Sequence, residues 1–299
     1  MKDEVNLRIA LQIADLHNIH LTGQQKIGFN LANKLAGHGI GTLVITNNRF
    51  FSAPAIFFNE DIEYVVIPGV ADIHNYLWHL GFIVRALKKF NPTLIHGHGF
   101  ASGNLVFFLG ELISRPTIHT VYDVPFDLRP IPYVQATGMR RAKWVICTSI
   151  FVKRQLEVLG VKSDKLKVLP YGVEDVWFDI HMQNRVPESV LFYGDANQAR
   201  GIDTLLEAIP MVLGKRPSAK FFLAIRACEP AYEEMILEFA EKGLLSLISL
   251  RKGQHISELT SMAQVIVLPY VMTTLQPPLT LIESLLSGKA VVTTDVEAK

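Results

Sequence analysis

The sequence predicts an α/β protein of two doubly wound domains, each built on a parallel sheet. Apolar stretches of strand length alternate with segments of helical periodicity along the chain, which is typical of such sheets. The alternation is interrupted by the polar stretch 173–187 and then restarts. At roughly 150 residues per domain, the 299 residues also correspond to two domains. We therefore expect a first domain at 1–172, a linker at 173–187 and a second domain at 188–299.

The first domain is expected to contain seven strands. They are mostly continuous apolar runs, as in strands of a parallel sheet that helices cover on both faces. The expected strands are 7–13, 42–46, 62–67, 93–95, 116–121, 144–148 and 166–169. One helix is expected between a loop at Thr22–Gly23 and Gly37, and another over 76–90, because apolar residues recur there at helical spacing.

The second domain repeats this pattern. Strands are expected at 189–193, 220–225, 245–250, 264–268 and 290–293, and helices at 202–213, 233–241 and 279–286. In open parallel sheets, ligands bind beyond the carboxyl ends of the strands, so polar residues expected directly after strands are site candidates. These candidates are His96, His98, His119, Asp123, Asp195, Arg200 and Arg226.

Charge is distributed unevenly between the two halves. The chain has 29 basic and 28 acidic residues, a net charge of +1, which points to neither nucleic acid nor a membrane. Residues 1–170 nevertheless carry 18 basic and 12 acidic side chains, a balance of +6, whereas residues 171–299 carry 11 and 16, a balance of −5. The basic half is expected to face an anionic partner, although a solvated face of surface helices explains the same charges.

Several protein classes are excluded by composition. Apolar residues make up 49% of the chain, so it can bury a large core. The longest apolar runs fall far short of the roughly 18 residues of a membrane span, and the acidic start is unlike a signal peptide. Cys147 and Cys228 lie far apart, which indicates neither a zinc site nor a disulfide framework. The expected location is the cytoplasm.

Two glycine patterns suggest nucleotide binding and need separate consideration. Gly23 and Gly28 have the spacing of a P-loop, but Phe29 and Asn30 stand where Lys and Ser or Thr belong, which excludes a Walker A site. The run 97–103 has three glycines after an expected strand and before a helix. It leaves open a dinucleotide-binding loop, and with it an NAD-dependent oxidoreductase, although its last spacing is one residue too long.

Short motifs in a fixed order resemble glycosyltransferase family 4. They include the glycine loop at Thr22–Gly23, Leu94-Ile-His-Gly-His98-Gly, Trp144-Val-Ile-Cys-Thr-Ser149, Lys167-Val-Leu-Pro-Tyr-Gly172-Val-Glu-Asp175, Val190-Leu-Phe-Tyr-Gly194 with Arg200-Gly201, and Pro277-Pro-Leu-Thr-Leu-Ile-Glu283. The resemblance implies the GT-B architecture, in which two Rossmann-like domains face a cleft. It also implies transfer of a sugar, with retention of configuration, from a UDP- or GDP-type nucleotide-diphosphate sugar.

The same resemblance assigns roles to individual residues. It implies donor contacts through Gly23, Arg200, the helix amides of Leu279 and Thr280, the ribose ligand Glu283 and the base-side His255. It makes His98 the catalytic candidate near the transferred sugar, with His119 and Thr22 as acceptor or sugar contacts. It implies no metal and no cofactor. The expected partners are the nucleotide sugar and a carbohydrate or lipid-linked acceptor, with peripheral contact at the inner membrane face and no nucleic acid.

Two residues depart from the family pattern. Asp195 stands in place of the arginine of its "GR" motif and puts a carboxylate where a diphosphate would arrive. Leu275 stands in place of the first glutamate of its E-x7-E motif. These departures put activity in doubt and support an alternative, in which a catalytically degenerate GT-B protein acts as a binding or regulatory partner. Arg226, expected at the end of the next strand, is a candidate to compensate for Asp195.

Two further expectations concern a surface helix and the chain end. Trp78, Phe82 and the pair Lys88-Lys89 could dock on a membrane, but the helix is expected to pack its apolar face on the sheet and leave its lysines in solvent. A relative would continue beyond residue 299 through further strand–helix units. The second domain is therefore expected to be incomplete and the chain truncated, with the strand 290–293 lacking neighbours.

Overall fold

The computed structural model describes residues 7–14, 23–48, 60–69, 73–124, 131–178, 180, 185–249, 256–272 and 278–296. Contacts between residues divide the chain into two units, 1–172 and 173–299. Each unit has its own parallel sheet and its own hydrophobic core.

Over its described residues, the first unit has a seven-stranded sheet in the order β3-β2-β1-β4-β5-β6-β7. The strands are β1 (Arg8–Gln12), β2 (Gly41–Asn48), β3 (Ile62–Pro68), β4 (Leu94–His98), β5 (Thr117–Val121), β6 (Trp144–Cys147) and β7 (Leu166–Val168). Neighbouring strands pair in parallel throughout. The helices are α1 (Gly23–Gly37), α2 (Ile73–Trp78), α3 (Leu80–Phe90), α4 (Gly103–Ile113), α5 (Ile131–Gln135), α6 (Thr137–Arg141) and α7 (Ile150–Val158).

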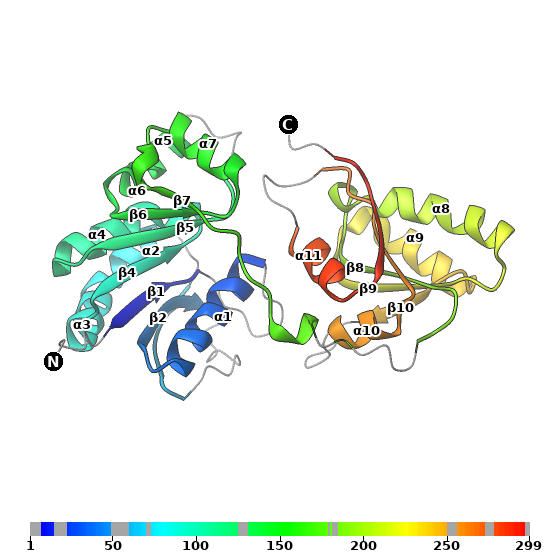
Figure 1. The fold of residues 1–299 in the computed structure, drawn as a ribbon, viewed down its shortest axis with the longest axis horizontal. Coiled ribbons are helices and arrows are strands. Elements are labelled where there is room, and N and C mark those ends of the chain that lie inside the picture. Colours follow the sequence, from blue (N-terminus) through cyan, green and yellow to red (C-terminus); the bar gives the residue numbers. More distant parts are fainter. Residues whose placement is uncertain are drawn as a thin grey trace. The chain divides into compact units, whose positions relative to one another are not determined.

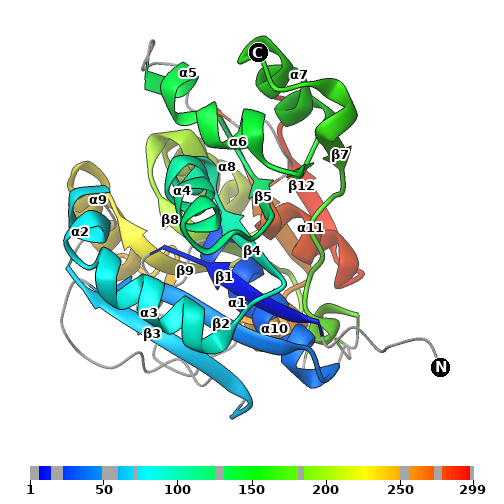
Figure 2. The same cartoon turned by 90° about the vertical axis from the view of Figure 1, so that its left-hand side faces the viewer.

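Helices cover both faces of this sheet, as strand periodicity requires. Along β1, Ala10 belongs to the cluster formed with α3 and α4, whereas Ile9 and Leu11 belong to the cluster formed with α1. Figure 2 shows α3 and α4 in front of the sheet and α1 behind it. The predicted doubly wound arrangement of the first half is confirmed.

In the second unit, the described residues contain a five-stranded parallel sheet in the order β10-β9-β8-β11-β12. The strands are β8 (Ser189–Ala196), β9 (Lys220–Cys228), β10 (Ser246–Ser249), β11 (Val265–Leu268) and β12 (Ala290–Thr293). The helices are α8 (Ile202–Lys215), α9 (Pro230–Glu241), α10 (Ile256–Met262) and α11 (Leu279–Leu286). Two short 3-10 helices, Asp175–Trp177 and Gln198–Arg200, are the elements that precede β8 and α8 in the chain.

The second core has the same two-sided construction. Phe192 of β8 packs with α8 and α9, whereas Leu191 and Tyr193 belong to the cluster that includes residues of α10 and α11. Figure 1 shows α8 and α9 on one side of β8 and β9, and α10 and α11 on the other. The second half is therefore also a doubly wound α/β unit, with a smaller sheet than the first.

The structure corrects several expected boundaries. The strand expected at 93–95 continues to His98, and those expected at 189–193 and 220–225 continue to Ala196 and Cys228. His96, His98, Asp195 and Arg226 therefore lie within strands and not after them, and His119 lies inside β5, within the strand expected at 116–121. Each extension contains a histidine or a charged residue, so the apolar pattern ends before the hydrogen-bonded pairing of the strands does.

The helix expected over 76–90 is two helices, α2 and α3, which are separated by a turn at His79. Its apolar face packs as expected, because Ile83, Leu87 and Phe90 are buried. Trp78 and Phe82 do not share this burial, since they are 87% and 56% exposed. Across the described part of the chain, no helix combines the length and the apolar character that crossing a bilayer requires.

Candidate functional site

The strand order of each sheet indicates where a ligand would bind. In open parallel sheets, ligands bind beyond the carboxyl ends of the strands, at the point where the strand order reverses. This point lies between β1 and β4 in the first unit and between β8 and β11 in the second. Polar side chains gather at both positions, as described below.

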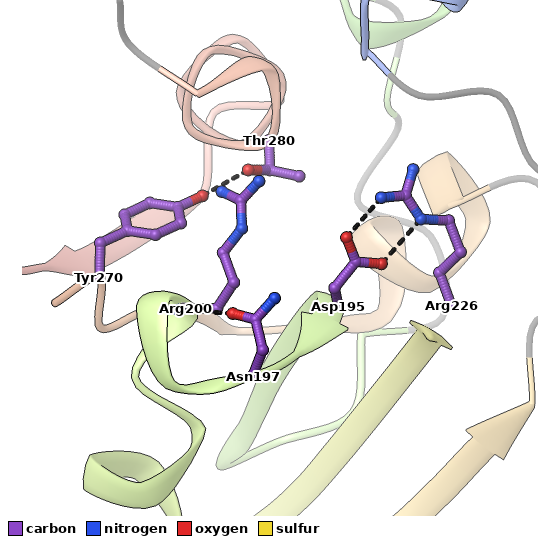
Figure 3. Close-up of polar contacts among 6 residues, drawn as sticks. All are labelled: Asp195, Asn197, Arg200, Arg226, Tyr270 and Thr280. Atoms are coloured by element: carbon purple, nitrogen blue, oxygen red, sulfur yellow. Dashed lines mark hydrogen bonds and ion pairs between the residues drawn. The ribbon is translucent and has the colours of Figure 1, made fainter. Parts of the chain in front are cut away.

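A charged pair joins two neighbouring strand ends in the second unit. Arg226 of β9 donates from Nε to Asp195 Oδ1 at 2.8 Å and from Nη2 to Asp195 Oδ2 at 2.5 Å. Figure 3 shows this two-pronged contact. Bidentate arginine–carboxylate pairs are among the stronger charge-assisted interactions, and they fix the plane of the guanidinium group.

A second arginine follows β8 in a tightly built turn. The side-chain oxygen of Asn197 accepts a hydrogen bond from the backbone N–H of Arg200 at 2.9 Å. Gly201 then adopts φ +68°, and a Cβ there would lie 1.7 Å from the carbonyl oxygen of Pro269. The backbone N–H groups of Val271 and Met272 donate to the carbonyl of Ala199, at 3.1 and 3.2 Å. The turn that carries Arg200 is therefore fastened to the segment after β11.

The side chain of Arg200 extends from this turn toward α11. Its guanidinium carbon lies 5.1 Å from the centre of the Tyr270 ring, within the range of a cation–π interaction. The Tyr270 hydroxyl is 2.5 Å from Thr280 Oγ1, in the first turn of α11 (Figure 3). The Tyr193 hydroxyl donates to the Thr280 carbonyl oxygen at 2.8 Å. Two tyrosines thus hold Thr280 in position beside Arg200.

Glu283 lies one turn further along α11 and is only 5% exposed. Burial first, and then the negative charge of Glu283, raise the pKa of Tyr193 well above its usual value. The pKa of Tyr270 is raised mainly by burial, and Thr280 and Arg200 oppose that shift. Both tyrosines are therefore neutral hydrogen-bonding groups at physiological pH.

This arrangement is suited to an anion. Two guanidinium groups stand at the strand ends, and the first backbone N–H groups of α11, at Leu279 and Thr280, have no acceptor within their own helix. A helix N-terminus with cationic side chains nearby is a favourable site for phosphate. The structure thus brings together Arg200, Leu279, Thr280 and Glu283, four of the predicted donor residues.

The first unit carries a cluster of buried histidines on β4 and β5. His98 Nδ1 is 2.9 Å from the Tyr122 hydroxyl, and His96 Nε2 is 2.8 Å from Thr120 Oγ1. The rings of His96 and His98 have centroids 4.3 Å apart. Among the described residues, His98 Nε2 and both ring nitrogens of His119 are buried without a hydrogen-bond partner. Buried polar atoms of this kind are uncommon and call for an explanation.

Burial keeps these imidazoles neutral. It lowers the pKa of His96 to about 4. Burial, with His96 as a second cause, lowers the pKa of His119 to about 3. The pKa of His98 falls well below its usual value because of burial and then of the two neighbouring histidines. At neutral pH the His98 ring can therefore donate one hydrogen bond and accept another, as only an uncharged imidazole does.

The glycines of the run 97–103 are explained by packing. A Cβ on Gly97 would lie 2.8 Å from His119 Nδ1, and one on Gly103 would lie 3.0 Å from Met139 Cε. Gly99 adopts φ +89°, which favours glycine at that position. These constraints account for the motif without a dinucleotide, so the oxidoreductase interpretation loses its support.

The structure places the remaining predicted residues as follows. Gly23 is the first residue of α1 and not part of a loop. Beside it, Gln24 Nε2 donates to Asp123 Oδ1 at 3.1 Å. Thr22, His255 and Leu275 lie outside the described residues. Tyr122, Tyr193 and Tyr270 were missed by the sequence analysis. A tyrosine at or just after the end of an apolar strand was the available signal.

Metal binding has no candidate cluster in the described ranges. No group of three or more His, Cys, Asp or Glu side chains is arranged there to hold a metal ion.

Two family models match the sequence. The model for Glycosyltransferase Family 4 matches residues 21–176, just over half of the chain. The model for glycosyl transferases group 1 matches residues 187–299. No curated protein sequence matches the chain.

Solved structures share the fold at low identity. HepE of Anabaena, solved with UDP, is 14% identical with a TM-score of 0.72, over 97% of this chain and 81% of that chain. A glycosyltransferase from Rickettsia africae is 17% identical with a TM-score of 0.75, over 98% and 80%. The pneumococcal O-GlcNAc transferase GtfA is 13% identical with a TM-score of 0.72, over 97% and 84%. With the two parallel sheets, these similarities confirm the expected GT-B architecture, and the chain belongs to Glycosyltransferase Family 4.

Proposed function

We propose that this protein transfers a sugar from a UDP- or GDP-linked donor to an acceptor hydroxyl, with retention of configuration. The observation that carries the proposal is the anion-binding arrangement at the reversal point between β8 and β11. Similar proteins support the donor class, because HepE was solved with UDP-glucose and GtfA with UDP and GlcNAc. The retaining course follows from the family resemblance.

The donor diphosphate is proposed to lie against the first turn of α11. Arg200 would contact a phosphate oxygen, and the backbone N–H groups of Leu279 and Thr280 would donate to the same group. The Tyr270–Thr280 hydrogen bond keeps the turn and the guanidinium side by side. Glu283 would accept hydrogen bonds from the ribose hydroxyls, and His255 would lie near the base. The family resemblance supports Gly23 as a further donor contact and Thr22 as an acceptor or sugar contact.

His98 is proposed as the residue beside the transferred sugar. Its buried Nε2 has no partner among the described residues, so a sugar hydroxyl could supply the missing hydrogen bond. His119 has two such nitrogens and would serve as a further acceptor or sugar contact. Since His98 is neutral, it would orient the sugar by hydrogen bonding and not by charge.

The proposed reaction breaks the bond between the sugar C1 and the diphosphate oxygen. The acceptor oxygen forms the new bond to C1 on the same face, and its proton passes to the departing diphosphate. Negative charge grows on that diphosphate as the bond breaks, so cations held in place beforehand would stabilise the transition state. Guanidinium groups supply this charge, and the proposal includes neither a metal ion nor a cofactor.

The acceptor is proposed to be a carbohydrate or a lipid-linked molecule bound by the first unit. The surface around α2 and α3 supports a peripheral membrane contact, because Trp78 and Phe82 are exposed next to the exposed side chains of Arg85 and Lys89. Aromatic side chains with nearby cations suit the interface of an anionic bilayer. The proposed location is the cytoplasm, in contact with the inner face of the membrane.

A donor screen tests the proposed activity. The full chain is incubated with UDP-glucose, UDP-galactose, UDP-N-acetylglucosamine and GDP-mannose, and the released nucleotide is measured. We expect slow hydrolysis of at least one donor, with an initial product of the donor's anomeric configuration by NMR. Glu283→Gln should slow the reaction at least tenfold, whereas Glu258→Gln, exposed on α10, should not.

Two outcomes would contradict the proposal in different ways. A product of inverted configuration would contradict the proposed retention of configuration but would leave the proposed sugar transfer standing. Nucleotide binding without release from any donor would favour the alternative, in which the chain is a catalytically degenerate binding or regulatory partner. Asp195 and Leu275 are the residues that support this alternative.

A further inference from the structure

The pair Asp195–Arg226 raises a question that the proposed donor site leaves open. A carboxylate lies at the end of β8, close to the proposed diphosphate position, where it would repel an anion. It is not isolated, because Arg226 binds both of its oxygens, at 2.8 and 2.5 Å. Both side chains also remain within reach of solvent, with 23% of Asp195 and 30% of Arg226 exposed.

The backbone is built to bring these two residues together. In the register of β8 and β9, Gly194 pairs with Ile225, and the register then shifts between Gly194 and Ala196. Gly194 has φ +139°, a conformation that L side chains rarely adopt. The irregularity falls where Asp195 meets Arg226. A local departure from the ladder at a sheet end often directs a side chain toward a site.

The charges of the cluster favour an anion despite the carboxylate. Arg200 and Arg226 contribute two positive charges and Asp195 one negative charge, so these three groups leave one positive charge. The negative charge of Glu283 lies one turn further along α11 than Thr280. Figure 3 shows Arg226 on its strand and Arg200 on the turn after β8, with Asp195 between their side chains and Thr280 next to Arg200. The pair with Asp195 engages Nε and Nη2 of Arg226 and so fixes the plane of its guanidinium group.

We propose that Arg226 is a second diphosphate-binding side chain and that Asp195 is its positioning residue. The cation that the family pattern places on β8 would thus be supplied from β9, in an orientation fixed by the carboxylate. This inference rests on the proposed function, because it assumes a nucleotide-diphosphate ligand in this unit. It also predicts that Arg226 discriminates a diphosphate from a monophosphate, whose charge ends closer to the nucleoside.

A calorimetric comparison of UDP with UMP tests the role of Arg226, with GDP and GMP as the parallel pair. Arg226→Gln should weaken diphosphate binding at least tenfold and monophosphate binding less than threefold. Arg216→Gln, which removes an exposed arginine just after α8, should leave both unchanged. Arg226→Lys keeps the charge without the two-pronged geometry and should fall between the wild type and Arg226→Gln.

A double-mutant cycle tests the role of Asp195. If Asp195 acts by orienting Arg226, then Arg226→Gln should cost less than threefold in UDP affinity when it is introduced into Asp195→Ala. An undiminished tenfold cost in that background would overturn the positioning role. The thermal unfolding of each variant is recorded first, so that only folded protein is compared.

The outcomes separate this inference from the proposed function. Binding of UDP or GDP to the wild type, with equal affinity in Arg226→Gln, would overturn the inference and leave the donor site intact. Equal losses for diphosphate and monophosphate would also overturn it, because Arg226 would then act on the fold of the site. A wild type that binds neither diphosphate would overturn the proposed function, and the inference with it.

Discussion

Asp195 shows how a single residue can mislead when it is considered without its neighbours. In the sequence it is a carboxylate at an expected phosphate position, and it argues against nucleotide binding. In the structure it is one half of a bidentate pair with Arg226, so its charge is balanced within the site. The sequence analysis named Arg226 as a candidate to compensate, but the geometry of the pair depends on a register shift that no local pattern reveals.

The histidine cluster predicts a pH-dependent stability. Because the pKa values of His96 and His119 are lowered to about 4 and about 3, the folded state stays unprotonated where the unfolded chain, with ordinary histidines, takes up protons. The contribution of these histidines to the free energy of unfolding is therefore fully present above the ordinary histidine pKa of about 6.5, and it falls as the pH decreases toward 4. We expect each buried histidine to cost about 1 kcal/mol between pH 7 and pH 5.5.

Urea unfolding at the two pH values measures this cost. His96→Gln should reduce the difference in the free energy of unfolding, whereas His74→Gln, which alters an exposed histidine on α2, should retain it. Equal stability of the wild type at pH 7 and pH 5.5 would show that the cluster is not buried as described.

Gly201 predicts a steric effect that is specific to one position. An alanine there would combine a positive φ with a Cβ 1.7 Å from the Pro269 carbonyl oxygen, so we expect a loss of about 3 kcal/mol in the stability of the second unit. Gly214, near the end of α8, has open space around its Cβ position. Gly214→Ala should instead stabilise the protein by about 0.5–1 kcal/mol. Thermal unfolding of both variants distinguishes these results, and similar melting temperatures would contradict them.

At the scale of elements, periodicity located the strands but not their polar ends, and it predicted no helix over α5, α6, α7 or α10. The helix 279–286 and the strand 290–293 were predicted with the observed bounds, because apolar residues fill both segments. β4, β8 and β9 were predicted too short, since His96, Asp195 and Arg226 interrupt the apolar pattern while the backbone pairing continues. An apolar pattern therefore underestimates strands that end in polar side chains.

The helices α2 and α3 give a prediction that concerns membrane contact. Replacement of the exposed Trp78 and Phe82 together by alanine should reduce binding to vesicles that contain phosphatidylglycerol at least tenfold. The reason is that the favourable free energy of moving each aromatic ring from water into the bilayer interface is lost. Phe178→Ala, which removes an exposed aromatic residue from the second unit, serves as the control. Cosedimentation measures the bound fraction. Failure of the wild type to bind these vesicles would contradict the proposed membrane contact.

For the whole molecule, the sequence predicted two doubly wound units and the family to which they belong. The strand orders and the family models agree with both predictions. The tyrosines that hold the site could not be predicted, because Tyr193 and Tyr270 resemble core residues until their hydroxyl groups are seen to meet Thr280.

The central claim is that the second unit binds a nucleoside diphosphate at the ends of β8 and β11. Calorimetric titration of the full chain with UDP and with GDP tests it most directly. We predict saturable one-to-one binding of at least one of them, and at least tenfold weaker binding in Arg200→Gln than in the control Arg216→Gln. No binding of either nucleotide at millimolar concentration, or equal affinities in the two variants, would contradict the claim.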